Sequence, residues 1–125
     1  MGKTVLLIED EPNIIEAISF LLERDGWTVR LHSEGIDAIA AVHRTNPDVV
    51  VLDVMLPGKS GFDILKDLRE AEATRALPIL MLTARGQTKD RELANRYGVN
   101  TFMTKPFSNA DMLQAVRELA ENEGT

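Results

Sequence analysis

The sequence predicts an α/β fold in which five parallel strands form one doubly wound sheet with helices on both faces. Short apolar runs alternate five times with longer segments whose apolar residues recur every three to four positions, the pattern of strands joined by amphipathic helices. The apolar runs are also continuous, as expected for parallel strands that are buried on both faces. A βα barrel is excluded because it needs about 250 residues, whereas this chain has 125.

Turn and cap residues set the expected bounds of each element. Pro12 and Gly26 bracket the first helix, Gly98 ends the fourth, and Ser108 caps the fifth. Strands are predicted over residues 4–9, 27–32, 48–53, 78–83 and 100–104, and helices over 13–26, 35–45, 62 to about 72, 88–97 and from 109 onward. The second strand alternates in polarity, which is typical of a sheet edge. We expect one domain, residues 1–125, with a core over 4–119 and a frayed tail over 120–125.

Composition limits the classes of function. The chain has 14 basic and 20 acidic residues and a net charge of −6, so direct nucleic-acid binding by this chain is not expected. The sequence contains no cysteine, which excludes disulfides and thiolate sites and fits a cytoplasmic protein. No apolar run approaches the length of a membrane span, and no basic-then-apolar leader precedes the first strand. We therefore expect a cytoplasmic protein whose partners are proteins or cations.

Polar residues follow four of the predicted strands at the point where each strand ends. They are Glu9 and Asp10, Asp53, Thr83, and Lys105 before Pro106. In a doubly wound sheet, ligands bind beyond the carboxyl ends of the strands. If the first and third strands are neighbours, three carboxylates meet there, and at least one should have a raised pKa unless a cation binds. Hard oxygen ligands without histidine or cysteine favour Mg²⁺, with Mn²⁺ as the alternative.

A phosphoryl group would complete such a site. Asp53 would be the nucleophile that carries it, and Lys105 and Thr83 would contact its oxygens. Each signal is weak by itself, because an aspartate after a strand is most often a turn or cap residue. Their joint occurrence at four strand ends is what points to phosphoryl chemistry.

These residues, together with Phe107 after Lys105-Pro106, resemble the receiver domain of two-component response regulators. The resemblance covers the chain from about Thr4 to Leu119. Within the family, the sequence is similar to chemotaxis receivers. The resemblance implies the flavodoxin-like strand order 2-1-3-4-5. It further implies that Asp53 accepts a phosphoryl group from a sensor histidine kinase. Mg²⁺ would be held by Glu9, Asp10, Asp53 and the backbone carbonyl of Met55.

The same resemblance implies which residues change conformation when the phosphoryl group binds. Lys105 would pair with the phosphate, and its bond to Pro106 would be cis. Thr83 would move inward to bond the phosphate while the aromatic side chain of Phe102 turns into the space that it leaves. Met55 and Arg85, two residues past Asp53 and Thr83, are placed to tune the lifetime of the phosphoryl group; this hypothesis comes from position alone.

The expected output is a change in protein binding at the face formed by the fourth helix, fifth strand and fifth helix, around residues 89–97 and Phe102. The partners would be a sensor kinase or phosphotransfer protein and a downstream protein or output domain, and a homodimer is a further possibility.

One alternative is a receiver fragment of a DNA-binding regulator, although Asn100 and Thr101 replace the acids usual in that subgroup. A small aspartyl-phosphate hydrolase is disfavoured, because Met55 stands where those enzymes carry their acid. We therefore expect a phosphoacceptor, not an enzyme.

Overall fold

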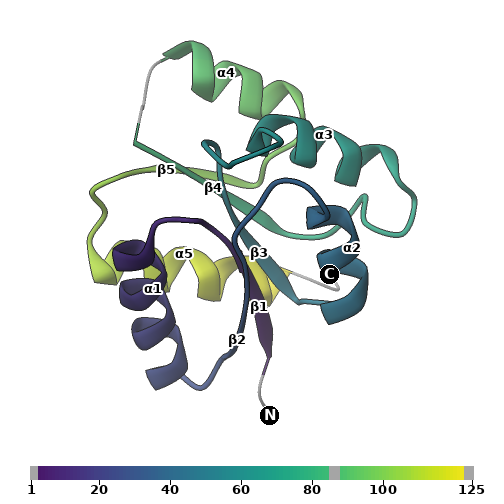
Figure 1. The fold of residues 1–125 in the computed structure, drawn as a ribbon. Coiled ribbons are helices and arrows are strands. Elements are labelled where there is room, and N and C mark those ends of the chain that lie inside the picture. Colours follow the sequence, from purple (N-terminus) through teal and green to yellow (C-terminus); the bar gives the residue numbers. More distant parts are fainter. Residues whose placement is uncertain (1–2, 85–87, 123–125) are drawn as a thin grey trace.

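The computed structural model describes residues 3–84 and 88–122 (Figure 1). Its strands and helices alternate along the chain, as predicted. The strands are β1 (Thr4–Ile8), β2 (Thr28–His32), β3 (Val49–Asp53), β4 (Ile79–Thr83) and β5 (Thr101–Thr104). The helices are α1 (Pro12–Arg24), α2 (Ala38–Thr45), α3 (Gly61–Glu70), α4 (Thr88–Arg96) and α5 (Asn109–Asn122).

All strand pairs are parallel, and their order in the sheet is β2-β1-β3-β4-β5. This order confirms the doubly wound fold and places the alternating strand β2 at an edge. The central strand β3 is buried along its whole length, which explains its unbroken run of apolar residues. The chain reverses its direction of winding between β1 and β3, so the carboxyl ends of these two strands flank the crevice where such sheets bind ligands.

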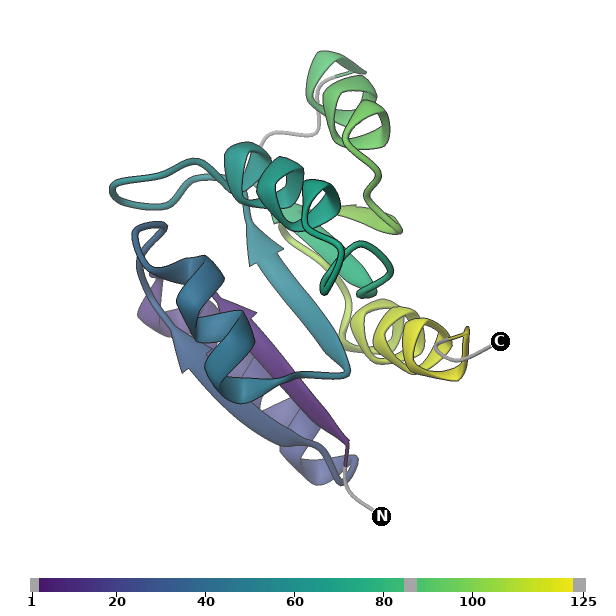
Figure 2. The ribbon, with the colours of Figure 1, turned by 90° about the vertical axis from the view of Figure 1, so that its right-hand side faces the viewer.

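Two layers of helices bury the two faces of the sheet (Figures 1 and 2). Alternate residues of each central strand point to opposite faces, so one strand supplies both layers. On one face, Ile18 and Leu22 of α1 and Val116 of α5 pack with Val51. On the other, the buried side chains of α2, α3 and α4 pack with the intervening strand residues. The strands β1, β3 and β4 thus lie between two apolar layers, whereas the edge strand β2 is largely exposed.

The element boundaries agree with the sequence analysis to within two residues except at the start of α2. That helix was predicted from residue 35 but begins at Ala38, because Asp37 has a left-handed φ of 67° that no helix accommodates. The preceding Gly35 donates its backbone N–H to the carbonyl of Pro57 at 2.9 Å. The prediction was therefore wrong for residues 35–37, which form a loop against the segment after β3.

Among the residues that the structure describes, no helix combines the length and apolar character that crossing a membrane requires.

Candidate functional site

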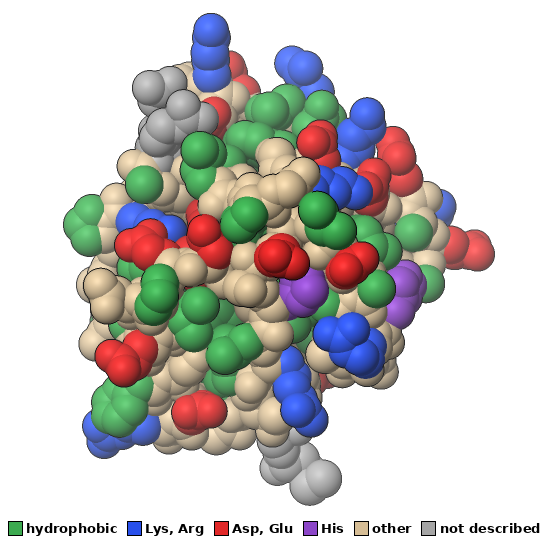
Figure 3. All heavy atoms as spheres, viewed as in Figure 1, with side chains coloured by type: hydrophobic (Ala, Val, Ile, Leu, Met, Phe, Trp, Pro, Cys, Tyr) green, Lys and Arg blue, Asp and Glu red, His purple; other side chains and the backbone are tan. Residues whose placement is uncertain are grey.

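Three carboxylates meet at the carboxyl edge of the sheet. Glu9 and Asp10 follow β1, and Asp53 ends β3; the two strands are hydrogen-bonded neighbours. One ligand oxygen from each residue lies within 4.8 Å of the others. Glu9 and Asp53 are only 1 % and 3 % exposed, whereas Asp10 is exposed. Figure 3 shows acidic side chains on the face where Figure 1 places the start of α1. The cluster is therefore half buried and reaches solvent through Asp10.

The backbone around Asp53 is held tightly. The N–H of Val54 donates to the carbonyl of Leu82 at 3.0 Å, and the N–H of Gly61 donates to the carbonyl of Val54 at 2.9 Å. A Cβ atom built on Gly61 would lie 2.2 Å from the carbonyl oxygen of Asp53. Only glycine therefore fits where α3 begins beside the acid.

Gly61→Ala is expected to destabilise the protein by about 3 kcal/mol, because the added methyl group must displace the backbone of Asp53. Urea unfolding measures this change. Gly26→Ala is the matched control: Gly26 has φ +94°, but a Cβ atom built on it would meet no described atom within 4 Å, so only backbone strain is added there. Equal losses in the two variants would contradict the tight packing against Asp53.

Lys105 is the cation of the site. Its ammonium nitrogen Nζ lies 3.1 Å from Glu9 Oε1, 3.4 Å from Glu11 Oε1 and 3.6 Å from Asp53 Oδ1. Its backbone N–H donates to the carbonyl of Thr83 at 2.7 Å, and its bond to Pro106 is cis. Burial lowers the pKa of Lys105, but the charges of Asp53 and Glu9 outweigh burial and leave that pKa above its usual value. Lys105 therefore stays charged.

The crowding of charged groups shifts the pKa of Asp53. Burial, followed by the charge of Glu9, raises the pKa of Asp53 to about 7, although Lys105 acts in the opposite direction. This confirms the expectation that one acid of the cluster has a raised pKa in the absence of a cation. A bound divalent cation would relieve the repulsion and favour the ionised carboxylate.

The residues present fit Mg²⁺. Glu9 Oε1 is buried without a hydrogen-bond partner among the described residues; Lys105 Nζ is close to it, but not in hydrogen-bond geometry. The three carboxylates at the carboxyl edge of the sheet supply the hard oxygen ligands that Mg²⁺ prefers. Met55, whose carbonyl is the fourth expected ligand, has its side chain 58 % exposed, and its N–H donates to Asp53 Oδ1 at 3.4 Å.

The residues expected to form the switch lie on the adjacent strands. Thr83 ends β4 and is fully buried, one position beyond the residue paired with Asp53. Phe102 lies on β5 and packs with the apolar layer of α2, α3 and α4. The guanidinium of Arg91, on α4, lies 4.8 Å from the centre of its ring. Arg85 is outside the described residues.

The sequence analysis missed the contact of Glu11 in the site and the structural role of Asn100, which precedes β5 at the opposite edge of the sheet. Glu11 contacts Lys105, and the run Glu9-Asp10-Glu11 was the signal that could have indicated it. Asn100 was noted only as a departure from a subgroup. In the structure its Oδ1 accepts hydrogen bonds from the N–H of Ile79 and from Arg69, so it ties β4 and α3 to the start of β5.

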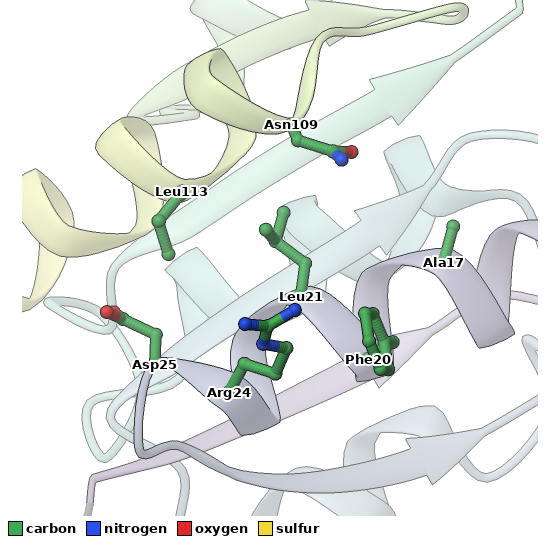
Figure 4. A pocket seen from close by; sticks show the side chains of 7 residues that line it. All are labelled: Ala17, Phe20, Leu21, Arg24, Asp25, Asn109 and Leu113. Atoms are coloured by element: carbon green, nitrogen blue, oxygen red, sulfur yellow. The ribbon is translucent and has the colours of Figure 1, made fainter.

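A separate hollow of about 440 Å³ lies between α1 and α5 (Figure 4). Its lining is mainly apolar, with the exposed ring of Phe20 and the side chains of Leu21 and Leu113. The guanidinium of Arg24 stacks 5.4 Å from the centre of the Phe20 ring. None of the carboxylates of the cluster lines this hollow, so it is distinct from the acidic site.

Comparison with known proteins places this geometry in a family. The model of the response regulator receiver domain matches residues 5–117. The probable transcriptional regulatory protein TcrX from Mycobacterium tuberculosis is 42 % identical over 121 residues, which cover 97 % of this chain and 51 % of TcrX. The chain thus spans about half the length of this relative.

Two solved structures show the same fold. One, from Chloroflexus aurantiacus and described as a response regulator, has a TM-score of 0.92 and 30 % identity over 98 % of this chain and 100 % of its own. The other is the receiver domain of a sensor histidine kinase from Pseudomonas aeruginosa, which holds a magnesium ion in its active site cleft; its TM-score is 0.89, with 30 % identity and the same coverage. The fold, the acidic cluster and the family match together show that this chain belongs to the response regulator receiver domains of two-component signalling.

Proposed function

We propose that this chain is a phosphorylation-dependent switch in which Asp53 accepts a phosphoryl group from the phosphohistidine of a sensor kinase. The observation that carries this proposal is the meeting of three carboxylates with one buried ammonium, Lys105, at the carboxyl edge of the sheet. The family match supports it. Asp53 is the acid that a rigid, fully buried strand holds in place.

The transfer uses Asp53 as a nucleophile. A carboxylate oxygen attacks phosphorus, the bond from phosphorus to the histidine nitrogen breaks, and the released imidazole takes up a proton. Lys105 would then bind one phosphoryl oxygen with its ammonium group, and Thr83 would offer its hydroxyl group to another. Because the same chain performs only its own phosphoryl transfer and dephosphorylation, it is a phosphoacceptor and not an enzyme acting on external substrates.

Mg²⁺ would be held by Asp10, Asp53, the carbonyl of Met55 and, through water, Glu9; Mn²⁺ is the alternative. When bound, the metal ion supplies positive charge that neutralises the carboxylates and the transferring phosphoryl group. The buried oxygen of Glu9, which accepts no hydrogen bond from the described residues, and the raised pKa of Asp53 support a cation at this place. The exposed side chain of Met55, together with Arg85, would limit how water reaches the phosphoryl group.

Phosphorylation would change the conformation of the face formed by α4, β5 and α5. Movement of Thr83 toward the phosphoryl group would free space for Phe102, whose ring now packs under Arg91. Such a rearrangement shifts the populations of two conformations and changes which proteins bind this face. A homodimer is one such complex.

The cellular setting of the switch is also a proposal. We propose a cytoplasmic protein that receives its phosphoryl group from a sensor kinase or a phosphotransfer protein and acts on a downstream protein or an attached output domain. TcrX, a probable transcriptional regulator about twice as long as this chain, supports a DNA-binding regulator as the protein that carries this domain. The net charge of −6 supports leaving DNA contacts to the attached domain.

Titration with Mg²⁺ and then beryllofluoride, followed by amide NMR, tests the proposal. We expect saturable shifts at Asp10, Asp53 and Met55 with millimolar Mg²⁺, and a second set at Thr83 and Phe102 when beryllofluoride is added. NMR is preferred to fluorescence because Trp27, the only tryptophan, precedes β2 and lies at the opposite end of the sheet. A protein that shows neither response would contradict the proposed function.

A further inference from the structure

We propose that Glu11 is a positioning residue that competes with the phosphoryl group for Lys105. The inference rests on the proposed function and deepens it. Glu11 lies outside the three-carboxylate cluster and its side chain is 57 % exposed. By holding Lys105 and adding a negative charge at the rim of the site, it would favour the cation and disfavour the anion.

The backbone of Glu11 is fixed although its side chain is exposed. Its N–H donates to Glu9 Oε2 at 3.1 Å, and its carbonyl accepts the N–H groups of Ile14 at 3.1 Å and Ile15 at 3.0 Å. Pro12, the first residue of α1, has a fixed φ angle and restricts the backbone of Glu11 before it. The side chain therefore starts from a set position next to the cluster and reaches Lys105, 94 residues away in the sequence.

The ammonium group of Lys105 is already engaged by anions. Three carboxylates surround it at 3.1 to 3.6 Å, those of Glu9, Glu11 and Asp53, and among the described residues its hydrogen bond goes to Glu11 Oε1 at 3.4 Å. The backbone of Lys105 is anchored to the carbonyl of Thr83, so the ammonium group has limited freedom to move. A phosphoryl oxygen that draws the ammonium group toward Asp53 would therefore compete with the hydrogen bond to Glu11.

Glu11 is the partner that Lys105 would release. Asp53 would carry the phosphoryl group itself, and Glu9, whose Oε1 is buried, would face the cation. Glu11 has neither role and is the most exposed of the three carboxylates. Its carboxylate would be hydrated again once it separates from Lys105. Its carboxylate also repels the oxygens of an incoming phosphoryl group. Both effects oppose the anion, whereas the same charge attracts the cation.

Removal of the Glu11 charge should therefore move the two affinities in opposite directions. For Glu11→Gln we expect beryllofluoride to bind about 5-fold more tightly at saturating Mg²⁺, and Mg²⁺ alone to bind about 3-fold more weakly, as suits a partly exposed pair. Amide NMR titrations measure both constants. Glu16→Gln, on the exposed side of α1, makes the same change in charge and should leave both constants within about 2-fold of wild type.

A shorter side chain separates contact from charge. Glu11→Asp keeps the charge but draws it back from Lys105, so we expect tighter beryllofluoride binding with little change for Mg²⁺. The inference is overturned if Glu11→Gln leaves beryllofluoride affinity unchanged, weakens it, or shifts both ligands as Glu16→Gln does. Failure of the proposed function is a different result, because wild type itself would then bind neither Mg²⁺ nor beryllofluoride.

Discussion

Asp53→Asn is expected to abolish phosphorylation of the chain by acetyl phosphate and Mg²⁺. The amide that replaces the carboxylate has no anionic oxygen to attack phosphorus, so the rate should fall at least about 100-fold. Intact-mass spectrometry after incubation would show a phosphorylated species for wild type and none for the variant. Because Asn is nearly the same size as Asp, the buried end of β3 should keep its packing.

Asp63→Asn is the matched control for this experiment. Asp63 lies in the first turn of α3 and is exposed, so its replacement changes the net charge equally without touching the cluster. It should be phosphorylated at the wild-type rate. Phosphorylation of Asp53→Asn at a comparable rate would show that another residue accepts the phosphoryl group.

Asp53→Asn is also expected to stabilise the metal-free protein at neutral and higher pH. The pKa of Asp53 is raised from 3.8 to about 7 in the folded chain, so the folded state binds a proton that the unfolded state releases. The stability linked to this proton is fully present below about pH 4 and is lost as the pH rises through 7. The free energy of unfolding of wild type should therefore fall by about 3 kcal/mol, relative to the variant, between pH 4 and pH 8.

Urea unfolding in the presence of a chelator measures this difference, and added Mg²⁺ supplies the internal check. Mg²⁺ should recover the lost stability for wild type, because it binds the folded carboxylates, and should do so far less for the variant. Parallel pH profiles for the two metal-free proteins would contradict the raised pKa of Asp53.

Much of the fold could be predicted from periodicity alone. The continuous apolar run at Val49–Leu52 predicted a strand buried on both faces, and the structure buries every residue of β3. The error at residues 35–37 has a physical cause that local patterns do not contain. Ile36 fits a helical stripe, but Gly35 packs against the segment after β3, where an added Cβ atom would lie 2.0 Å from the carbonyl oxygen of Lys59, and the left-handed Asp37 delays the start of the helix.

Positions in the site could be predicted because strand ends converge in a parallel sheet. Glu9, Asp53 and Lys105 are brought together by β1, β3 and the segment after β5. The contact of Glu11 with Lys105 could not be predicted, because it depends on the direction of the side chain of the residue just before α1. The role of Asn100 as an acceptor for two separate segments likewise depends on tertiary packing.

The most direct test of a phosphoryl group on Asp53 is to locate it chemically. After reaction with acetyl phosphate and Mg²⁺, borohydride reduces an aspartyl phosphate to homoserine, and peptide mass spectrometry reports the residue that was converted. We predict homoserine at position 53, and no conversion when a chelator removes Mg²⁺. Conversion at another aspartate, or equal conversion at position 53 without Mg²⁺, would contradict a metal-dependent phosphoacceptor at the end of β3.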